Sequence, residues 1–510
     1  MKIKAIIFFS FILFFAPVLG YGQTDPMVKS IQDRFDLYGK TALQEKIYLH
    51  TDRSFYLVGE TMWFKAYYLN GSTHRFLDMS KVAYMEVLDK ENNAIIQTKF
   101  SLLAGKGNGS LLIPATIGSG TYKVRCYTNW MKNFSSDYFF ETTITVVNPF
   151  VKFDPNPDDK QEVTYDIQFF PEGGQLVKNV ESKVGFRAVA SNGKGIDFNG
   201  VVVDQKNDTI VKFFPKKFGI GNFAFKPVEG NAYKVLIRDT KGKISTYKLP
   251  EVKDYGYVMQ VKDSTANLVK VLLTVQTEKP ENNITVFTHT HQENGYAETK
   301  PLFGKKAVFL LDKNKLGEGI SQITIFNDAG KPVCERLYFK RPAKGLIIDG
   351  KVSKQEYATR DKVIMDLSTA SDAGIAEMSN LSVSVYMTDS IPMDDHESIS
   401  SYLYLSSDLK GNIESPEYYA QRNSKEADQD IDNLMITHGW RRFKWDDIFA
   451  NTTPSFPNLP EFDGHFITGK LMNTVTGEPA NGIGTYLAAP DFQPGYTIRK
   501  VICRGWFVLK

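Results

Sequence analysis

The sequence predicts an all-β protein built of tandem antiparallel β-sandwiches with a few short helices. The chain has 510 residues, which at roughly 150 residues per domain indicates several domains. Aromatic residues make up 13% of it, and 38 glycines and 22 prolines are spread along it, which favours short strands joined by many turns. From Lys46 to Val147, apolar and polar residues alternate with no helical pattern between successive strands. Such strands are expected to pair antiparallel in sandwiches of about 100 residues.

Charge and cysteine content exclude several classes of protein. The 61 basic and 58 acidic residues give a net charge of +3 with no basic block, so no nucleic-acid partner is expected. Three cysteines, Cys126, Cys334 and Cys503, are too few for a disulfide scaffold, and we interpret Cys126 and Cys334 as small buried residues. Hydrophobic residues at 42% and charged residues at 23% are ordinary for a folded protein and exclude wholesale disorder.

Residues 1–22 have the layout of a secretory signal peptide. Lys2 and Lys4 precede an apolar run from Ala5 to Leu19, and the small residues around Tyr21 indicate cleavage after Gly22. The alternative is an uncleaved membrane anchor, but the run is shorter than the roughly 20 residues that a spanning helix needs. We therefore expect export, and no transmembrane segment after cleavage.

The predicted elements follow in chain order. Residues 23–45 are expected to contain a helix, because Val28, Ile31, Phe35 and Tyr38 recur at spacings of three and four. The first sandwich occupies 46–149, with strands expected at 46–51, 61–69, 81–88, 121–127 and 141–147.

A joint rich in proline and aspartate at 149–157 ends this first unit. Beyond it we predict β-sandwiches at 150–252 and 253–343, a β-sandwich with a helical insertion and a proline-rich linker at 344–460, and a last β domain at 461–510.

One short pattern occurs twice, at Tyr56–Trp63 and at Tyr357–Ile364. Each copy has a tyrosine, a turn and a carboxylate before a strand. We predict that Tyr56, Gly59 and Trp63 are structural, with both aromatic side chains packed beneath the turn. Asp52 and Glu60 are expected to act locally, Asp52 by accepting backbone N–H bonds. The alternative makes these two carboxylates a cation site.

Few residues present a pattern typical of catalysis or metal binding. His289 and His291 would share one face of a strand and could begin a metal site, with Glu293 and Glu298 nearest in sequence. A solvent-facing strand explains the same residues, and we favour it. The acidic run 428–432 imitates a calcium loop, but Asn433 and Gly439 stand where that loop requires glycine and glutamate, and an acidic helix N-terminus explains it better. We therefore predict no catalytic, cofactor-binding or metal-binding residues, and no enzyme.

Several segments resemble a known family. Residues 45–68 and 118–124 resemble the second macroglobulin domain of alpha-2-macroglobulin-like proteins, through Thr51-Asp52, Tyr56, Gly59-Glu60 and Trp63-Phe64-Lys65. With His50 before Thr51, this form is most similar to exported Gram-negative proteins that join macroglobulin-like units to outer-membrane uptake modules. Further matching segments lie at 169–175, 318–328, 333–337, 381–385 and 438–445.

Residues 467–482 resemble the start of a carboxypeptidase regulatory-like domain, a name that implies a fold and no peptidase. In longer relatives the plug of a TonB-dependent receptor can follow, and we expect Lys510 to cut the last unit short.

The resemblance implies immunoglobulin-like, macroglobulin-like sandwiches and a non-catalytic envelope protein. We expect it in the periplasm or at the outer-membrane surface, where it serves binding or assembly with envelope proteins. A TonB-dependent receptor or a peptidase is a possible partner. The alternative is an endopeptidase inhibitor that offers the charged stretch 423–432 as a flexible bait. It would lack a thioester, because Tyr127, Glu335 and Arg504 follow the three cysteines instead of the required Gly-Glu-Gln. A third hypothesis is an enzyme that uses His289 and His291.

Overall fold

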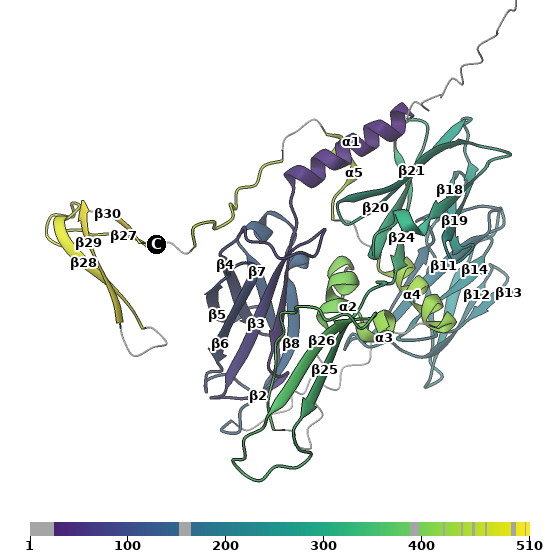
Figure 1. Cartoon of the computed structure of the whole chain (residues 1–510). Coiled ribbons are helices and arrows are strands. Elements are labelled where there is room, and N and C mark those ends of the chain that lie inside the picture. The colour runs from purple at the N-terminus through teal and green to yellow at the C-terminus, as the bar shows by residue number, and fades with distance from the viewer. Residues whose placement is uncertain are drawn as a thin grey trace, which may run out of the picture.

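The computed structural model shows a chain folded mainly into antiparallel sheets (Figure 1). It describes residues 25–151, 165–387, 397–421, 424–439, 442–450, 454–464, 467–490, 496–504 and 506–509. The predicted all-β class, with a few short helices, is confirmed. The predicted signal peptide at 1–22 lies outside the described residues. Among the helices that are described, none is long and apolar enough to cross a membrane.

The first sandwich packs a three-stranded sheet, in the order β1-β3-β6, against a five-stranded sheet, in the order β2-β8-β7-β4-β5. Apolar residues at alternate positions, such as Ile47, Phe64, Val124 and Ile144, meet in one core between the two sheets. The strands are β1 (Glu45–Thr51), β2 (Phe55–Leu57), β3 (Thr61–Asn70), β4 (Val82–Leu88), β5 (Ala94–Ser101), β6 (Lys106–Leu112), β7 (Gly120–Thr128) and β8 (Phe140–Val147).

The second sandwich pairs the sheets β14-β11-β9 and β13-β12-β15-β16 around a core rich in phenylalanine. A two-residue parallel pair, β10 with β17, lies beside them. The strands are β9 (Tyr165–Pro171), β10 (Leu176–Val177), β11 (Ser182–Ala190), β12 (Phe198–Val203), β13 (Thr209–Phe213), β14 (Ile220–Phe225), β15 (Lys234–Asp239), β16 (Ile244–Tyr247) and β17 (Val252–Lys253).

The third sandwich pairs the sheets β18-β19-β22 and β21-β20-β23-β24. Its strands are β18 (Gly256–Asp263), β19 (Leu268–Gln276), β20 (Asn283–Thr290), β21 (Glu293–Pro301), β22 (Lys306–Asp312), β23 (Gly319–Phe326) and β24 (Pro332–Lys340). The predicted N-terminal helix, α1 (Pro26–Thr41), lies along β20 and β21 (Figure 1). Asp25 caps it by accepting the Met27 N–H at 2.7 Å, and Ile31 and Phe35 pack against Phe287.

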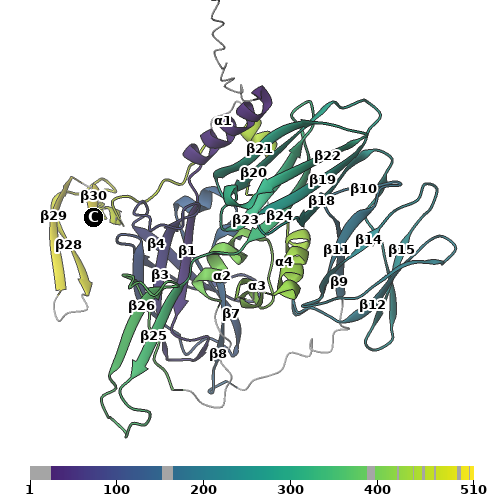
Figure 2. The same cartoon turned by 45° about the vertical axis from the view of Figure 1, so that its right-hand side comes forward.

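The fourth unit differs from the sandwich predicted at 344–460. Its described strands, β25 (Leu346–Val352) and β26 (Met365–Ser371), form a two-stranded ribbon that projects beside the first sandwich (Figures 1 and 2). The helices that follow do not cover this ribbon, because their apolar side chains pack against the first three sandwiches instead. These helices are α2 (Ile399–Tyr404), α3 (Pro416–Gln421), α4 (Lys425–Thr437) and α5 (Trp445–Phe449).

The stretch 423–432 was expected to be flexible, and this is wrong for its described part. Residues 425–437 form α4, which Ser424 caps and whose first turn is acidic, as the alternative to a calcium loop predicted. Ala427, Asp430 and Ile431 are buried. In Figure 2 the helix lies between β24 of the third sandwich and β9 and β11 of the second.

The last described unit contains two pairs of antiparallel strands, β27 with β30 and β28 with β29. They are β27 (Ile467–Lys470), β28 (Asn481–Pro490), β29 (Tyr496–Arg504) and β30 (Trp506–Leu509). In Figure 1 this unit lies apart from the three sandwiches.

The turn after β1 is built from local hydrogen bonds, largely as predicted. The Tyr56 hydroxyl is buried and donates to Asp52 Oδ1 at 2.7 Å, and the same oxygen accepts the Trp63 N–H at 2.9 Å. Glu60 accepts the Leu57 N–H at 2.8 Å, and Gly59 has a φ of 85°. The prediction for Trp63 is wrong, because its side chain is 57% exposed. It alternates with Met62 and Phe64, which occupy the buried face of β3.

Candidate binding site

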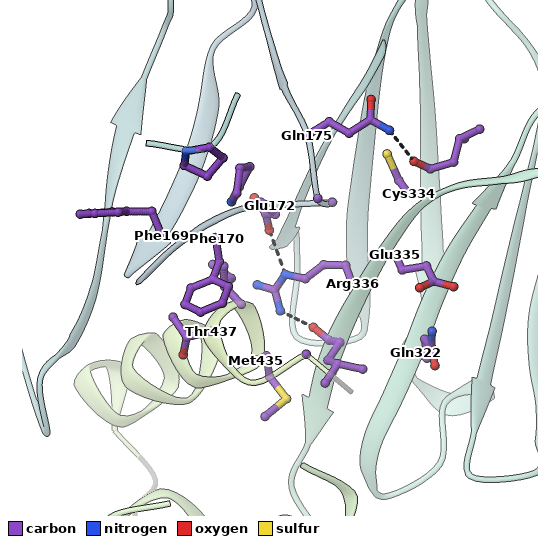
Figure 3. Close-up of a pocket in the computed structure, with 18 of the residues that line it drawn as sticks. Phe169, Phe170, Glu172, Gln175, Gln322, Cys334, Glu335, Arg336, Met435 and Thr437 are labelled. Carbon is purple, nitrogen blue, oxygen red and sulfur yellow. Dashed lines mark hydrogen bonds and ion pairs between the residues drawn. The ribbon is translucent and has the colours of Figure 1, made fainter. Parts of the chain in front are cut away.

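A cleft of about 710 Å³ lies between the second and third sandwiches (Figure 3). Three segments far apart in sequence form most of its wall. They are residues 169–175 at the end of β9 and in the turn after it, residues 332–337 of β24, and Met435, Ile436, Thr437 and Gly439 at and just after the end of α4. A cleft of this volume is large enough for a small molecule or several residues of a peptide.

Both strands that line the cleft are edge strands. Among the described strands, β9 pairs only with β11 and β24 pairs only with β23. Consecutive residues of each strand line the cavity. On β24 the main-chain carbonyls of Val333 and Leu337 already accept hydrogen bonds, from Gln175 Nε2 at 3.2 Å and from Arg336 Nη1. Gly173 and Gly174, with φ of 81° and 94°, turn the chain away after β9. A Cβ atom on Gly173 would lie 2.8 Å from Met259, so this close approach requires glycine.

An ion network centred on the buried Glu172 and Arg336 joins the cleft wall to α4. Arg336 Nε lies 3.1 Å from Glu172 Oε1, and Arg336 Nη2 lies 2.5 Å from Asp432 Oδ1. Lys183 reaches Asp432 Oδ2 at 3.1 Å. One arginine of the third sandwich thus bonds to the second sandwich through Glu172, as Figure 3 shows, and to α4 through Asp432.

Burial and charge act differently on the two carboxyl groups. Burial raises the pKa of Glu172, and the nearby cations only partly oppose it. For Asp432 burial also acts upward, but Arg336 and Lys183 outweigh it and leave the pKa below its ordinary value. The second carboxylate oxygen of Glu172, Oε2, is buried and has no hydrogen-bond partner among the described residues. A buried unpaired acceptor in a cleft wall favours a ligand that brings a donor.

A second buried charge cluster joins the first and third sandwiches. Asp408, which follows α2, has its Oδ2 atom 2.9 Å from both Lys46 Nζ of β1 and His291 Nε2 of the turn after β20. Its Oδ1 atom lies 2.7 Å from Arg442 Nη2. Burial acts upward on the pKa of Asp408, but the three basic groups hold it well below its ordinary range. Burial lowers the pKa of Lys46 to about 8, although Asp408 opposes that shift.

The two histidines singled out from the sequence do not form a metal site with other described residues. His289 is buried between aromatic rings that include Phe35 and Phe443, and its Nδ1 atom lies 2.7 Å from the His291 carbonyl. His291 lies beyond the end of the strand with a φ of 52°, so the two imidazoles do not share a strand face. No group of three or more His, Cys, Asp or Glu side chains in the described part of the chain could hold a metal ion.

Cys126 and Cys334 are buried and free, as interpreted from the sequence, and burial raises the pKa of both thiols. No sequence pattern identifies Glu172 and Arg336 in the cleft wall, or their neighbour Asp432 on α4. The resemblance of segments 169–175 and 333–337 to a known family is the one sequence signal that points to Glu172 and Arg336. Nothing local in the sequence indicates that they meet.

No family model and no curated protein matches the sequence. Solved structures are similar to it in part. Native alpha-2-macroglobulin from Escherichia coli is 9% identical over 64% of this chain and 25% of its own, with a TM-score of 0.18. Dimeric latent PorU from Porphyromonas gingivalis is 9% identical over 57% of this chain and 33% of its own, with a TM-score of 0.26. A tetra-tandem repeat from the extending region of a large adhesion protein is 8% identical over 66% of this chain and 91% of its own, with a TM-score of 0.17. This chain thus spans about a quarter to a third of the length of the first two proteins.

Proposed function

We propose that this chain is a non-catalytic binding or assembly protein of the bacterial envelope, and that it binds an extended peptide segment of a partner protein in the cleft. The observation that carries the proposal is that two edge strands, β9 and β24, line one cavity. An extended peptide can add to such an edge through main-chain hydrogen bonds, while side-chain pockets set its specificity.

The polar groups of the cleft fit a peptide better than an apolar small molecule. Glu172 Oε2 can accept a hydrogen bond from a main-chain N–H or from a basic side chain. Because Arg336 and Lys183 already balance the charge of Glu172 and Asp432, a neutral donor suffices. The walls are largely preformed, since the ion network fixes β24 against the second sandwich and α4.

Export by residues 1–22 would place the cleft in the periplasm or at the outer-membrane surface. The resemblance to proteins that carry uptake modules makes an outer-membrane receptor of the TonB-dependent class the expected partner. The peptidase-inhibitor alternative depended on a flexible charged stretch at 423–432. Most of that stretch is a packed helix, so this support is lost.

Photocrosslinking tests the proposal. A benzophenone amino acid would replace Val333 in the cleft or, as a matched control, Ile244, which is exposed on β16 at the far edge of the second sandwich. We expect one envelope protein to crosslink at position 333 and not at 244 when the full chain is expressed in Gram-negative cells. Crosslinks of equal pattern at both positions, or to cytoplasmic proteins alone, would contradict the proposal.

A further inference from the structure

We infer that the β25–β26 ribbon is one half of a fourth sandwich, and that it binds a β-hairpin of alternating apolar residues that the described part of the chain does not contain. This surface is separate from the cleft, and the inference does not depend on it.

The ribbon repeats the β1–β3 pair of the first sandwich. β1 and β25 both have seven residues, and their partners pair in the same register. Ile47 pairs with Tyr68 as Ile348 pairs with Thr369. Thr51 pairs with Phe64 as Val352 pairs with Met365, so the correspondence holds along the whole strand.

The connection between the strands is also repeated in atomic detail. The Tyr56 hydroxyl accepts the Arg53 N–H at 3.2 Å, and the Tyr357 hydroxyl accepts the Lys354 N–H at 3.0 Å. Glu60 accepts the Leu57 N–H at 2.8 Å, and Asp361 accepts the Ala358 N–H at 3.0 Å. Gly59 and Arg360 both have positive φ, of 85° and 68°. The two pairs of strands therefore have the same turn and the same register, and we treat them as two copies of one structural unit.

The two copies differ in what covers them. Ile47 and Met62 are fully buried, whereas their counterparts Ile348 and Val363 are 55% and 54% exposed. The other inward positions follow the same rule: Thr51, Phe64 and Ala66 are buried, while Val352, Met365 and Leu367 are exposed. In the first sandwich the cover is the sheet that contains β4, β7 and β8. No described strand covers the ribbon, so the apolar face that is buried in the first sandwich is exposed in this copy.

The first sandwich indicates which strands would cover the ribbon. There β4 hydrogen-bonds to β7, and β7 to β8, to form the covering sheet. Val383 to Met387 occupy the place of β4 in the repeat, are mostly exposed, and form no described strand. β7 has nine residues and β8 has eight, whereas only nine residues separate Met387 from the next described residue, Glu397.

Hydrogen bonds hold Leu381 and Ser382 to β3 of the first sandwich. Lys65 Nζ donates to the Leu381 carbonyl at 2.5 Å, and the Tyr67 hydroxyl donates to Ser382 Oγ at 3.1 Å. The first sandwich thus fixes the segment that leads into 383–387. The incoming hairpin would add one strand to 383–387, as β7 adds to β4, and lay its apolar face on Ile348, Met365 and Leu367.

Hydrogen exchange of the full chain tests this inference with a defined probe. The probe is a synthetic peptide of residues 120–147, the β7–β8 hairpin, with Cys126→Ser to prevent oxidation. We expect saturable slowing of backbone exchange by about tenfold in 346–371 and 383–387 at peptide concentrations up to about 1 mM. A scrambled peptide should slow neither segment.

Two variants locate the site. Leu367→Asp places a charge on the inward face and should abolish the slowing, whereas Ile347→Asp, on the opposite face and 51% exposed, should retain it. Exchange in the three sandwiches reports whether each variant is folded. No slowing with the hairpin, or equal loss in both variants, would overturn the inference. The alternative is that a second copy of this chain binds the ribbon, and sedimentation of the chain alone tests it. A dimer that Leu367→Asp dissociates would overturn the inference in favour of that second copy.

Discussion

Replacing Asp408 by asparagine tests the charge cluster that joins the first and third sandwiches. Asparagine keeps the shape of the side chain and removes its charge, so Lys46 and Arg442 lose the carboxylate that they share. Both cations are largely removed from water, with side chains 2% and 11% exposed. A buried charge without its partner is strongly destabilising.

The two cations contribute differently to the expected loss. Burial lowers the pKa of Lys46 to about 8, so this amine can release its proton once Asp408 no longer opposes that shift. At pH 7.5, half a pKa unit below that value, releasing the proton from Lys46 costs less than about 1 kcal/mol. Arg442 cannot release its proton, and a partner lost from a buried pair costs about 3–5 kcal/mol. Since Arg442 keeps some exposure, we take the lower end and expect a total of about 3–4 kcal/mol.

Urea unfolding followed by tryptophan fluorescence at pH 7.5 measures this loss. Glu141→Gln is the matched control, because Glu141 also bonds two cations, Arg125 at 2.7 Å and Lys123 at 3.1 Å, but is one third exposed. Its loss is expected to be below about 1 kcal/mol. If Asp408→Asn costs no more than this control, the cluster does not hold the sandwiches together and the reasoning is refuted.

Three further predictions concern single residues. Tyr56→Ala should cost about 3–5 kcal/mol in thermal unfolding, and Trp63→Ala less than about 1 kcal/mol, because only Tyr56 is buried; equal losses would contradict this. Calcium should leave the melting temperatures of wild type and Asp52→Ala unchanged, because Arg53 already lies 3.4 Å from Asp52 and 3.3 Å from Glu60; a rise in wild type alone would restore the cation-site alternative. Burial lowers the pKa of His289 to about 4, so the stability that it contributes above pH 6.5 is lost as the pH falls toward 4. Between pH 7.5 and 5 the loss is about 2 kcal/mol, and His289→Asn should show a decrease smaller by that amount in urea unfolding.

Patterns that act within a few residues could be predicted from the sequence. The two-residue alternation predicts five of the eight strands of the first sandwich, β1, β3, β4, β7 and β8, but not β2, β5 or β6. The capped helix α1 follows from its apolar spacing. The turn at Tyr56 was predictable because its hydrogen bonds join residues at most eleven positions apart. Trp63 was misjudged through its residue type, although the alternation places it on the same face of β3 as Thr61 and Lys65. At this position the two-residue alternation of the strand, and not the hydrophobicity of the side chain, determines its exposure.

The cleft could not be predicted in the same way. Glu172 and Arg336 are 164 positions apart, and Lys183 and Asp432 are 249 apart. Each of these residues is an ordinary charged residue in its local sequence, and only the packing of the sandwiches brings them together. The charged residues in the first turns of α4 likewise predict a flexible stretch, although one face of this helix is buried. Charge density alone does not distinguish an exposed linker from a helix whose carboxylates are paired.

The two charge clusters explain why a chain of separate sandwiches has a preformed cleft. Linkers alone would let neighbouring sandwiches reorient, since contacts between domains are usually small and polar. Here Asp408 joins the first sandwich to the third, and Arg336 joins the third to the second and to α4. Buried ion pairs add little net stability, but a displaced partner leaves an uncompensated charge, so they penalise every other orientation. The geometry between β9 and β24 is therefore set by specific pairing, and a ligand that enters the cleft does not have to order the sandwiches first.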